Sequence, residues 1–201
     1  MTTQVKNVTY SNFANEYLDD MINVAVGRFG ENYIDRKKIL DHVNCDNEMC
    51  TLALDENGNV LGYCLFFEDN MNSAEKDFKI PKQELISVTG SNSSICHTKS
   101  MALRKDCEKM GLGYNLFNRT LNKAQKIGYK AAWCPAWKRG SYVPVENVLL
   151  KSGFTFFKTV HRIWEDDKNY TCVECNGPCK CDAAIYCLLY TSPSPRDLST
   201  S

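Results

Sequence analysis

The sequence predicts one domain of the mixed α/β (α+β) class, in which helices flank a mixed, mainly antiparallel sheet. The chain has 201 residues, a length typical of a single domain. Apolar residues recur at helical spacing within 15–29 and 114–127, whereas 60–67 and 95–103 are short apolar runs typical of strands. The predicted order of elements is β-α-α-β-β-β-α-β-α-β-β. A dinucleotide-binding fold alternates strands and helices more strictly, so this order favours a largely antiparallel sheet.

The N-terminal half is expected to hold a strand, two helices and a hairpin, followed by a loop. Gly30 ends the first helix, and Asp35 is a suitable N-cap for the second. Asp55-Glu-Asn-Gly58 separates two apolar runs, which is a strong hairpin signal. Residues 68–94 are polar and are expected to form a long loop with one helical turn near Gln83. The expected elements span residues 5–10, 15–29, 35–43, 51–54 and 60–67.

The C-terminal half contains a glycine loop between a predicted strand and a predicted helix. The loop closes on Gly111-Leu-Gly113, and helical spacing starts directly after it. Backbone N–H groups at a helix start point outward at the positive end of the dipole, and glycine lets a phosphate approach closely, so this loop can hold an anion. Pro135 is expected to end the strand that follows. The expected elements here are strands 95–103, 129–134, 154–164 and 183–186, with helices 114–127 and 145–151.

The last fifteen residues change character abruptly. Cys187-Leu-Leu-Tyr-Thr-Ser-Pro-Ser-Pro-Arg-Asp197 resembles the in-frame translation of a transposase-type sequencing adapter. We therefore expect a folded domain over 1–186 and a disordered, non-native tail over 187–201, so that the natural C-terminus is cut off. The alternative is a natural disordered tail rich in Ser and Pro, which gives the same structural expectation.

Composition and charge narrow the possible partners and location. The chain has 24 Lys and Arg residues and 24 Asp and Glu residues, so its formal net charge is zero and a general nucleic-acid binder is not expected. The N-terminus has no apolar signal core and no long apolar stretch follows, which speaks against secretion or membrane spanning. We expect a cytoplasmic protein whose 11 cysteines are thiols or metal ligands.

Four of these cysteines lie close together near the C-terminus. Cys172, Cys175, Cys179 and Cys181 surround the tight turn Asn176-Gly-Pro178. Close cysteines folded over a turn form knuckles that hold a tetrahedral zinc ion, and four thiolates leave no open position, so we predict a structural zinc site over 172–181. The alternatives are four reduced, unligated cysteines or a disulfide pair. The other cysteines before the tail are expected to be core residues: Cys45, Cys50, Cys64, Cys96, Cys107 and Cys134.

The element order, the glycine loop and one late turn resemble the GNAT superfamily of acetyl-CoA-dependent N-acetyltransferases. The family's loop is written Arg/Gln-x-x-Gly-x-Gly/Ala, and here it reads Glu108-Lys-Met-Gly-Leu-Gly113. Leu150-Lys-Ser-Gly-Phe154 is similar to the family's late Gly-Phe turn. The resemblance covers residues 2–186 by element order. It implies a GNAT-like fold and an enzyme that moves an acetyl group from acetyl-CoA to a primary amine by direct attack in a ternary complex.

The resemblance also implies roles for particular residues. Near Leu103 the strand would separate from its neighbour, and the Leu103 N–H would bind the acetyl carbonyl and stabilise the oxyanion. His97 lies fourteen residues before Gly111, an offset at which several GNAT enzymes carry a Glu or His base. His97 shares strand parity with Leu103, so both are expected to face the same side; a structural histidine is the alternative. The coenzyme's pyrophosphate would lie on backbone amides of Lys109, Met110, Gly111, Leu112, Gly113 and Tyr114.

Two residues depart from the family pattern. Glu108 stands where the family has a basic or amide residue, so we expect its side chain to turn outward and Lys105 and Lys109 to supply positive charge. Leu149 stands where the family often has the tyrosine that protonates the leaving thiolate. Tyr142 is the candidate substitute for that acid, and water is the alternative.

The acceptor is expected to be a small-molecule or peptide amine, with neither a nucleic acid nor a membrane as partner. Trp133, Trp137 and Tyr142 cluster near the end of a predicted strand, where they either line the acceptor pocket or pack at its rim. The departures at Glu108 and Leu149 also allow a different function, a non-catalytic acyl-CoA-binding or zinc-knuckle interaction module on the same scaffold.

Overall fold

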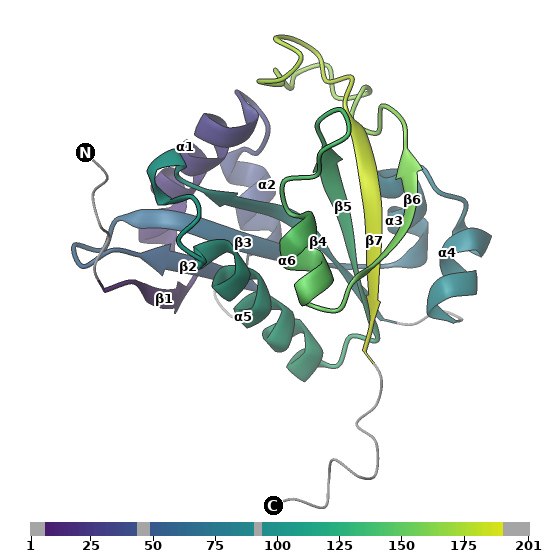
Figure 1. Ribbon diagram of the computed structural model, residues 1–201, viewed down its shortest axis with the longest axis horizontal. Coiled ribbons are helices and arrows are strands. Elements are labelled where there is room, and N and C mark those ends of the chain that lie inside the picture. Colours follow the sequence, from purple (N-terminus) through teal and green to yellow (C-terminus); the bar gives the residue numbers. More distant parts are fainter. Residues whose placement is uncertain (1–6, 44–48, 91–93, 191–201) are drawn as a thin grey trace, which may run out of the picture.

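The computed structural model describes residues 7–43, 49–90 and 94–190, and its centre is a seven-stranded sheet (Figure 1). The strand order is β1-β2-β3-β4-β5-β7-β6; β4 and β5 run parallel, and every other neighbouring pair is antiparallel. This confirms the predicted mixed, mainly antiparallel sheet. The strands are β1 (Thr9–Asn12), β2 (Cys50–Leu54), β3 (Val60–Asp69), β4 (Ile95–Leu103), β5 (Ala131–Lys138), β6 (Thr155–Val160) and β7 (Asp182–Leu189).

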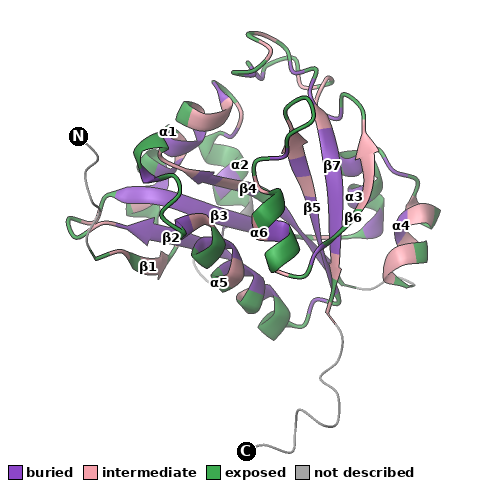
Figure 2. Cartoon of the chain, in the orientation of Figure 1, coloured by how far each residue is buried: buried purple, intermediate pink, exposed green. Residues whose placement is uncertain are grey.

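Helices cover both faces of the sheet, and the central strands are buried between them (Figure 2). Helices α5 and α6 lie on one face, where Leu116 and Phe117 of α5 pack with Phe66 of β3. Helices α1 to α4 cover the other face. The helices are α1 (Leu18–Phe29), α2 (Arg36–His42), α3 (Met71–Phe78), α4 (Lys82–Thr89), α5 (Leu112–Ile127) and α6 (Glu146–Lys151), with the short 3-10 turns η1 (Asn15–Tyr17) and η2 (Lys105–Cys107).

Several local signals in the sequence have the predicted effect. The Asp35 side chain caps α2 by accepting a hydrogen bond from the Lys38 N–H. Gly58 adopts φ 83° in the β2–β3 turn, and its N–H donates to the Asp55 carbonyl at 3.1 Å. Gly128 ends α5 in the left-handed region.

The predicted long loop over 68–94 is wrong, because the described part of this segment contains α3 and α4. The Asn70 side chain caps α3 by accepting hydrogen bonds from the Asn72 and Ser73 N–H groups. Met71, Ala74 and Phe78 then form a short buried stripe. The segment therefore supplies a second pair of helices to the face that carries α1 and α2.

Two predicted strand ends are also corrected. Pro135 lies inside β5, because β4 no longer pairs with that edge at this point and the missing N–H removes no ladder hydrogen bond there. Strand β7 continues past residue 186 to Leu189, since residues 187–189 pair with β5. The rest of the predicted tail, 191–201, lies outside the described residues, and its likeness to an adapter stays a prediction. No helix in the described ranges is long and apolar enough to cross a membrane.

Candidate active site between strands β4 and β5

The centre of the sheet opens between its two parallel strands. Within the described chain, β4 and β5 pair only where Ile95–His97 lies beside Ala131–Trp133, and beyond these residues the strands diverge. The Arg104 N–H donates to the Leu61 carbonyl at 2.8 Å, which makes Leu103 and Gly62 a non-hydrogen-bonded pair of the β3–β4 ladder. The Leu103 N–H therefore points away from β3, toward the opening.

Met101 has the same orientation as Leu103, because backbone N–H groups alternate between the two edges of a strand. The opening therefore receives two N–H groups from β4, and sequence reasoning singled out only the second. Gly62 makes room for this arrangement: a Cβ at this position would lie 2.4 Å from the Leu103 Cδ2 atom and 2.7 Å from the Ala102 carbonyl oxygen.

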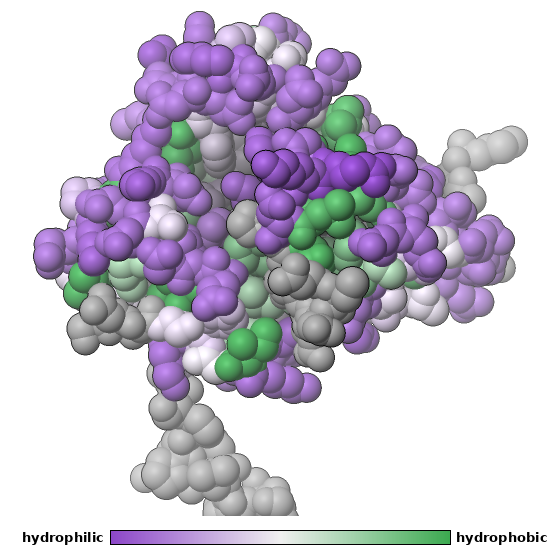
Figure 3. Space-filling model, turned by 180° about the vertical axis from the view of Figure 1, so that it is seen from behind, coloured by the Kyte–Doolittle hydropathy of each residue, from purple (hydrophilic) through white to green (hydrophobic). Residues whose placement is uncertain are grey.

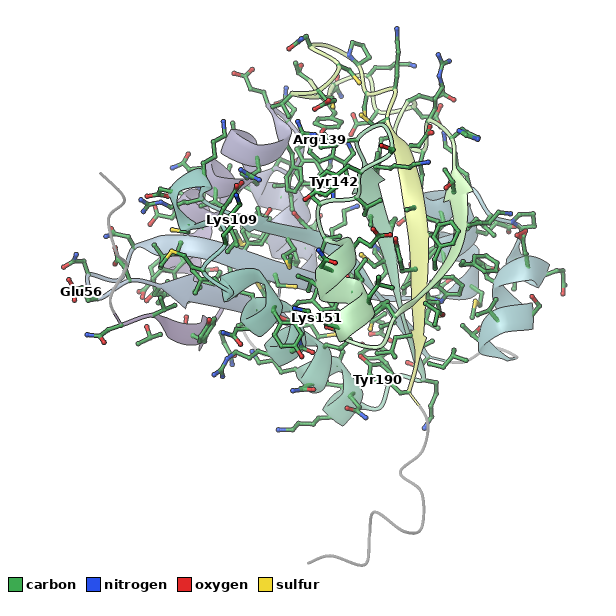
Figure 4. The ribbon with its side chains drawn as sticks, viewed as in Figure 1. Glu56, Lys109, Arg139, Tyr142, Lys151 and Tyr190 are labelled. Atoms are coloured by element: carbon green, nitrogen blue, oxygen red, sulfur yellow. The ribbon has the colours of Figure 1, made fainter. Side chains whose placement is uncertain are left out.

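The glycine loop packs directly against this end of β4. Lys109 and Gly111 adopt left-handed φ values of 63° and 76°, and α5 begins at the next residue, so the first N–H groups of α5 have no partner within the helix. An ideal Cβ on Gly113 would lie 3.6 Å from the Leu103 side chain. Figure 4 shows Lys109 in this loop, close to the start of α5. The predicted anion site and the predicted oxyanion donor thus adjoin each other.

The unusual acidic residue of the loop has a basic partner. Glu108 forms an ion pair in which its Oε1 atom lies 2.6 Å from Nη1 of Arg28 on α1. A cavity of about 450 Å³ lies between α1 and the loop, and Arg28, Arg104 and Lys105 contribute to its lining. Arg28 therefore offsets the Glu108 carboxylate, whereas Arg104 is paired with Asp106, which lines the same cavity.

His97 forms a buried pair with an acid that the sequence did not reveal. Its Nδ1 atom lies 2.8 Å from Oδ2 of Asp69, the last residue of β3, and the two side chains are only 6% and 4% exposed. The rings of Phe67 and Phe78 enclose the imidazole. The carboxylates of Asp69 and Asp77 and a ring nitrogen of His97 lie within 4.8 Å of one another. The pair is thus a carboxylate–histidine arrangement beside a second acid.

The expectation that His97 and Leu103 face the same side is wrong. A β-bulge interrupts the β3–β4 register, since Leu65 pairs with Ser100 while Phe66 pairs with Thr98, which leaves Lys99 as the extra residue. One extra residue reverses the alternation of side chains. His97 therefore faces α3, whereas Leu103 packs with the core beneath α5.

A cavity of about 250 Å³ lies on the His97 side of the opening. It is lined by residues from α3, β4, β5 and the β6–β7 segment, among them Asp77, His97, Pro135 and Trp164. On the face shown in Figure 3 the surface is mostly hydrophilic, with a hollow beneath the loops at the top of the molecule. The cavity thus lies on one face of the sheet and the glycine loop on the other, with the opening between β4 and β5 between them.

The expected aromatic cluster does not line this cavity. Trp133 is fully buried and packs with Phe78 and Phe157. Trp137 packs with the cysteine knuckle, and Tyr142 is 61% exposed in a turn with Arg139 (Figure 4). The structure therefore places Leu103 beside the glycine loop, His97 further along β4 on the opposite face, and Tyr142 outside the cavity lining.

The remaining cysteines of the described chain are buried core residues: Cys50, Cys64, Cys96, Cys107, Cys134 and Cys187. Burial raises the pKa of the Cys134 thiol to about 12, so Cys134 is protonated at neutral pH and is not an activated nucleophile. Cys45 lies outside the described residues.

The four clustered cysteines form a knuckle in the β6–β7 segment, as the sequence predicted. Their sulfur atoms all lie within 4.8 Å of one another, and no disulfide joins them. The Cys181 sulfur lies 3.9 Å from that of Cys172 and 3.6 Å from that of Cys175. A tetrahedral zinc site with Zn–S bonds of about 2.3 Å has S–S edges of about 3.8 Å. The donor set therefore fits a zinc ion.

Of the knuckle thiols, Cys172 has a lowered pKa, whereas burial raises the pKa of Cys181 to about 11 and raises that of Cys179 further. Burial acts to raise the pKa of the Cys172 thiol, but hydrogen bonds from the backbone N–H groups of Cys175 and Glu174 lower it. The Lys180 N–H donates to the Cys175 sulfur at 3.3 Å, and the Cys172 N–H closes the turn by donating to the Gly177 carbonyl. N–H donors directed at sulfur are what a metal–thiolate site requires.

No protein-family model and no curated protein matches the sequence, but solved structures match its fold. The NatC complex bound to Gag peptide and CoA is 12% identical, with a TM-score of 0.67 over 92% of this chain and 100% of the matched chain. An agmatine N-acetyltransferase mutant in apo form is 12% identical, with a TM-score of 0.64 over 92% of this chain and 100% of the other. A GCN5-related N-acetyltransferase from Kribbella flavida is 12% identical, with a TM-score of 0.58 over 91% and 98%. The chain therefore has the GNAT fold, as its sequence resemblance implied.

Proposed function

We propose that the protein transfers an acetyl group from acetyl-CoA to a primary amine. The observation that carries this proposal is the opening between β4 and β5, where the buried His97–Asp69 pair lies on one side and the Leu103 N–H adjoins the glycine loop. These are the groups that amine acetylation needs: a proton acceptor, an oxyanion donor and an anion site.

The coenzyme's pyrophosphate binds the N–H groups of residues 109–114, where the α5 dipole favours negative charge. Its extended arm lies along the free edge of β4, as an added strand would. The Met101 and Leu103 N–H groups both face this edge and are available to the arm and the acetyl group, with Leu103 as the proposed oxyanion donor. A preorganised donor of this kind contributes about 3–4 kcal/mol to acyl transfer.

The acceptor enters from the His97 side. The acceptor is a small-molecule or peptide amine that reaches the site as an ammonium ion, and Asp77 supplies a carboxylate beside the His97 ring. Asp69 accepts a hydrogen bond from Nδ1–H of His97, so Nε2 carries the free lone pair and takes a proton from the ammonium ion through intervening water.

The neutral amine then attacks the thioester carbon directly. The N–C bond forms as electrons move to the carbonyl oxygen, which the Leu103 N–H stabilises, and the C–S bond breaks as that intermediate collapses. Coenzyme A leaves as a thiolate. Tyr142 is the proposed donor of a proton to this thiolate, and water is the alternative donor.

A non-catalytic acyl-CoA-binding or zinc-knuckle interaction module is the second candidate. Two observations favour it: Glu108 places a carboxylate in the loop, and Leu149 is fully buried in the core beneath α6, so it offers no proton donor. Such a module would bind acetyl-CoA without turning it over.

One experiment separates the two candidates. Purified protein is incubated with acetyl-CoA and a panel of polyamines, arylalkylamines and peptides, and the release of free coenzyme A thiol is measured. An enzyme releases thiol with at least one amine. A rise in melting temperature on adding acetyl-CoA, with no thiol released across the panel, would establish the binding module instead, and the absence of both responses would overturn both candidates.

We further propose that the knuckle binds one zinc ion through Cys172, Cys175, Cys179 and Cys181. The sulfur spacing and the N–H donors directed at sulfur support this assignment. A bound zinc ion would crosslink the segment between β6 and β7, and four thiolates leave no position for substrate. Metal analysis of protein purified without added zinc is expected to give one zinc ion per chain.

A further inference from the structure

The cysteine knuckle is attached to the turn between α1 and α2. The Thr171 N–H donates to the Glu31 carbonyl and the Val173 N–H to the Phe29 carbonyl, both at 3.1 Å. Gly30 lies between these two bonds with φ 112°, and a Cβ at this position would lie 2.0 Å from the Thr171 carbonyl oxygen. Figure 1 shows the β6–β7 segment above the end of α1. The two backbones are therefore in direct contact at a position that only glycine allows.

Two tyrosines extend this contact to β4. The Tyr170 hydroxyl donates to the Phe29 carbonyl at 3.0 Å, and the Tyr170 ring lies 5.5 Å from the ring of Tyr33. The Tyr33 hydroxyl in turn donates to the carbonyl of Lys99 at 3.2 Å. Lys99 is the extra residue of the bulge that separates the orientation of His97 from that of Leu103. A continuous series of contacts thus connects the knuckle to the bulge.

The knuckle also supports one wall of the acceptor cavity. Trp164 packs against the cysteine cluster and lines the cavity. Asp167 lines the cavity as well, and its carboxylate lies 3.9 Å from the Lys38 ammonium of α2. By contrast, the cavity beside the glycine loop is lined by α1 and residues 104–106, none of them from the knuckle.

We infer that the loaded knuckle is a positioning device for the acceptor half of the active site. Metal at the four cysteines fixes Tyr170, Tyr170 holds the α1–α2 turn and Tyr33, and Tyr33 holds the bulge at Lys99 beside His97. Tyr33 is the positioning residue through which the knuckle acts on the reaction. Metal occupancy thereby controls acceptor binding and leaves acetyl-CoA binding unchanged. Only the kinetic test of this inference depends on the proposed acetyl transfer.

The first test follows backbone amide exchange in the full-length protein with zinc bound and after zinc removal by a chelator. We expect deuterium uptake to rise in 29–34 and 163–171 as well as in the knuckle, while 104–113 and the acetyl-CoA-induced rise in melting temperature stay unchanged. A change confined to 172–181, or no zinc in the protein, would overturn the inference. This arm needs no turnover, so it is independent of the proposed activity.

The second test uses Tyr33→Phe, which removes one hydrogen bond and leaves the cysteines intact. Misplacing a reacting group by about 1 Å can lower the rate about 100-fold. We therefore expect the acceptor KM to rise, or kcat to fall, at least tenfold, with the KM for acetyl-CoA unchanged. Tyr17→Phe, near the start of α1, is the matched control. If Tyr33→Phe keeps wild-type kinetics and wild-type exchange in 29–34, the knuckle does not act through Tyr33. If neither the wild-type protein nor the Tyr33→Phe variant shows acetyl transfer, the amide-exchange measurement alone tests the inference.

Discussion

At the scale of single residues, the chemistry of His97 depends on a neighbour far away in the sequence. Asp69 lies 28 residues earlier, at the end of the adjacent strand. In the β3–β4 ladder Phe67 lies opposite His97, so Asp69 is the diagonal neighbour on the same face. The sequence alone identified His97 by its offset from Gly111, but the acid requires the strand register, which only the fold supplies.

The buried pair gives the first prediction. We expect His97→Ala to lower kcat/KM by about 100-fold to 10,000-fold, because it removes the proton acceptor. Asp69→Asn is expected to lower it as well, since an amide can donate a hydrogen bond to Nδ1 and so favour the tautomer in which Nε2 is protonated. Steady-state rates with a fixed acceptor check both changes.

His161→Ala is the matched control, because His161 is exposed and also pairs with a carboxylate, that of Asp182. It should leave the rate unchanged. A wild-type rate in His97→Ala would make His97 the structural histidine that the sequence left open.

Gly62 gives a second prediction at the residue scale. A methyl group at this position would meet Leu103 Cδ2 at 2.4 Å and a backbone oxygen at 2.7 Å. We expect Gly62→Ala to lower the free energy of unfolding by about 1–3 kcal/mol and to displace Leu103. The matched control is Gly27→Ala in α1, where no heavy atom lies within 4 Å of the added carbon. Alanine should stabilise that helix by up to about 1 kcal/mol. Equal melting temperatures for the two variants would contradict the close contact.

At the scale of elements, the sequence predicted best where its signals were local. The cap at Asp35, the turn at Gly58 and the glycine loop all work through neighbouring backbone groups. Helix α3 was missed because its apolar stripe is only three residues long and its cap, Asn70, follows a strand without a break. The bulge at Lys99 could not be predicted from the sequence, because a bulge is defined by the pairing of β4 with its partner strand β3.

The start of α5 carries the third prediction. Glu108 places negative charge beside amides that are proposed to bind a pyrophosphate, and Arg28 offsets it only in part because both side chains are partly exposed. Charges at a helix N-terminus are typically worth 0.3–1 kcal/mol. We therefore expect Glu108→Gln to lower the Kd for acetyl-CoA about two- to fivefold, as measured by calorimetry.

Glu56→Gln, in the exposed β2–β3 turn, is the control for the same change of charge (Figure 4). It should leave the Kd unchanged. Weaker binding in Glu108→Gln would mean that the Arg28–Glu108 pair itself shapes the loop.

At the scale of the whole molecule, the fold was predictable and the relation between its parts was not. The resemblance of the element order, glycine loop and Gly-Phe turn to a known family pointed to the GNAT fold, and cysteine spacing predicted the knuckle. The sequence did not show that the knuckle contacts the α1–α2 turn, because that contact joins Gly30 to Thr171, which lie far apart in the sequence. Contacts between distant segments of this kind leave no periodic signal in a sequence.

The bulge at Lys99 has a kinetic consequence. Because it turns His97 and Leu103 to opposite faces, the proposed reaction gives its two substrates separate entrances to the opening, so neither would block the path of the other. We therefore expect acetyl-CoA and the amine to add in random order. A dead-end analogue of each substrate should then inhibit competitively against its own substrate and noncompetitively against the other. Uncompetitive inhibition by the amine analogue against acetyl-CoA would instead indicate an obligatory order, with the coenzyme completing the acceptor site.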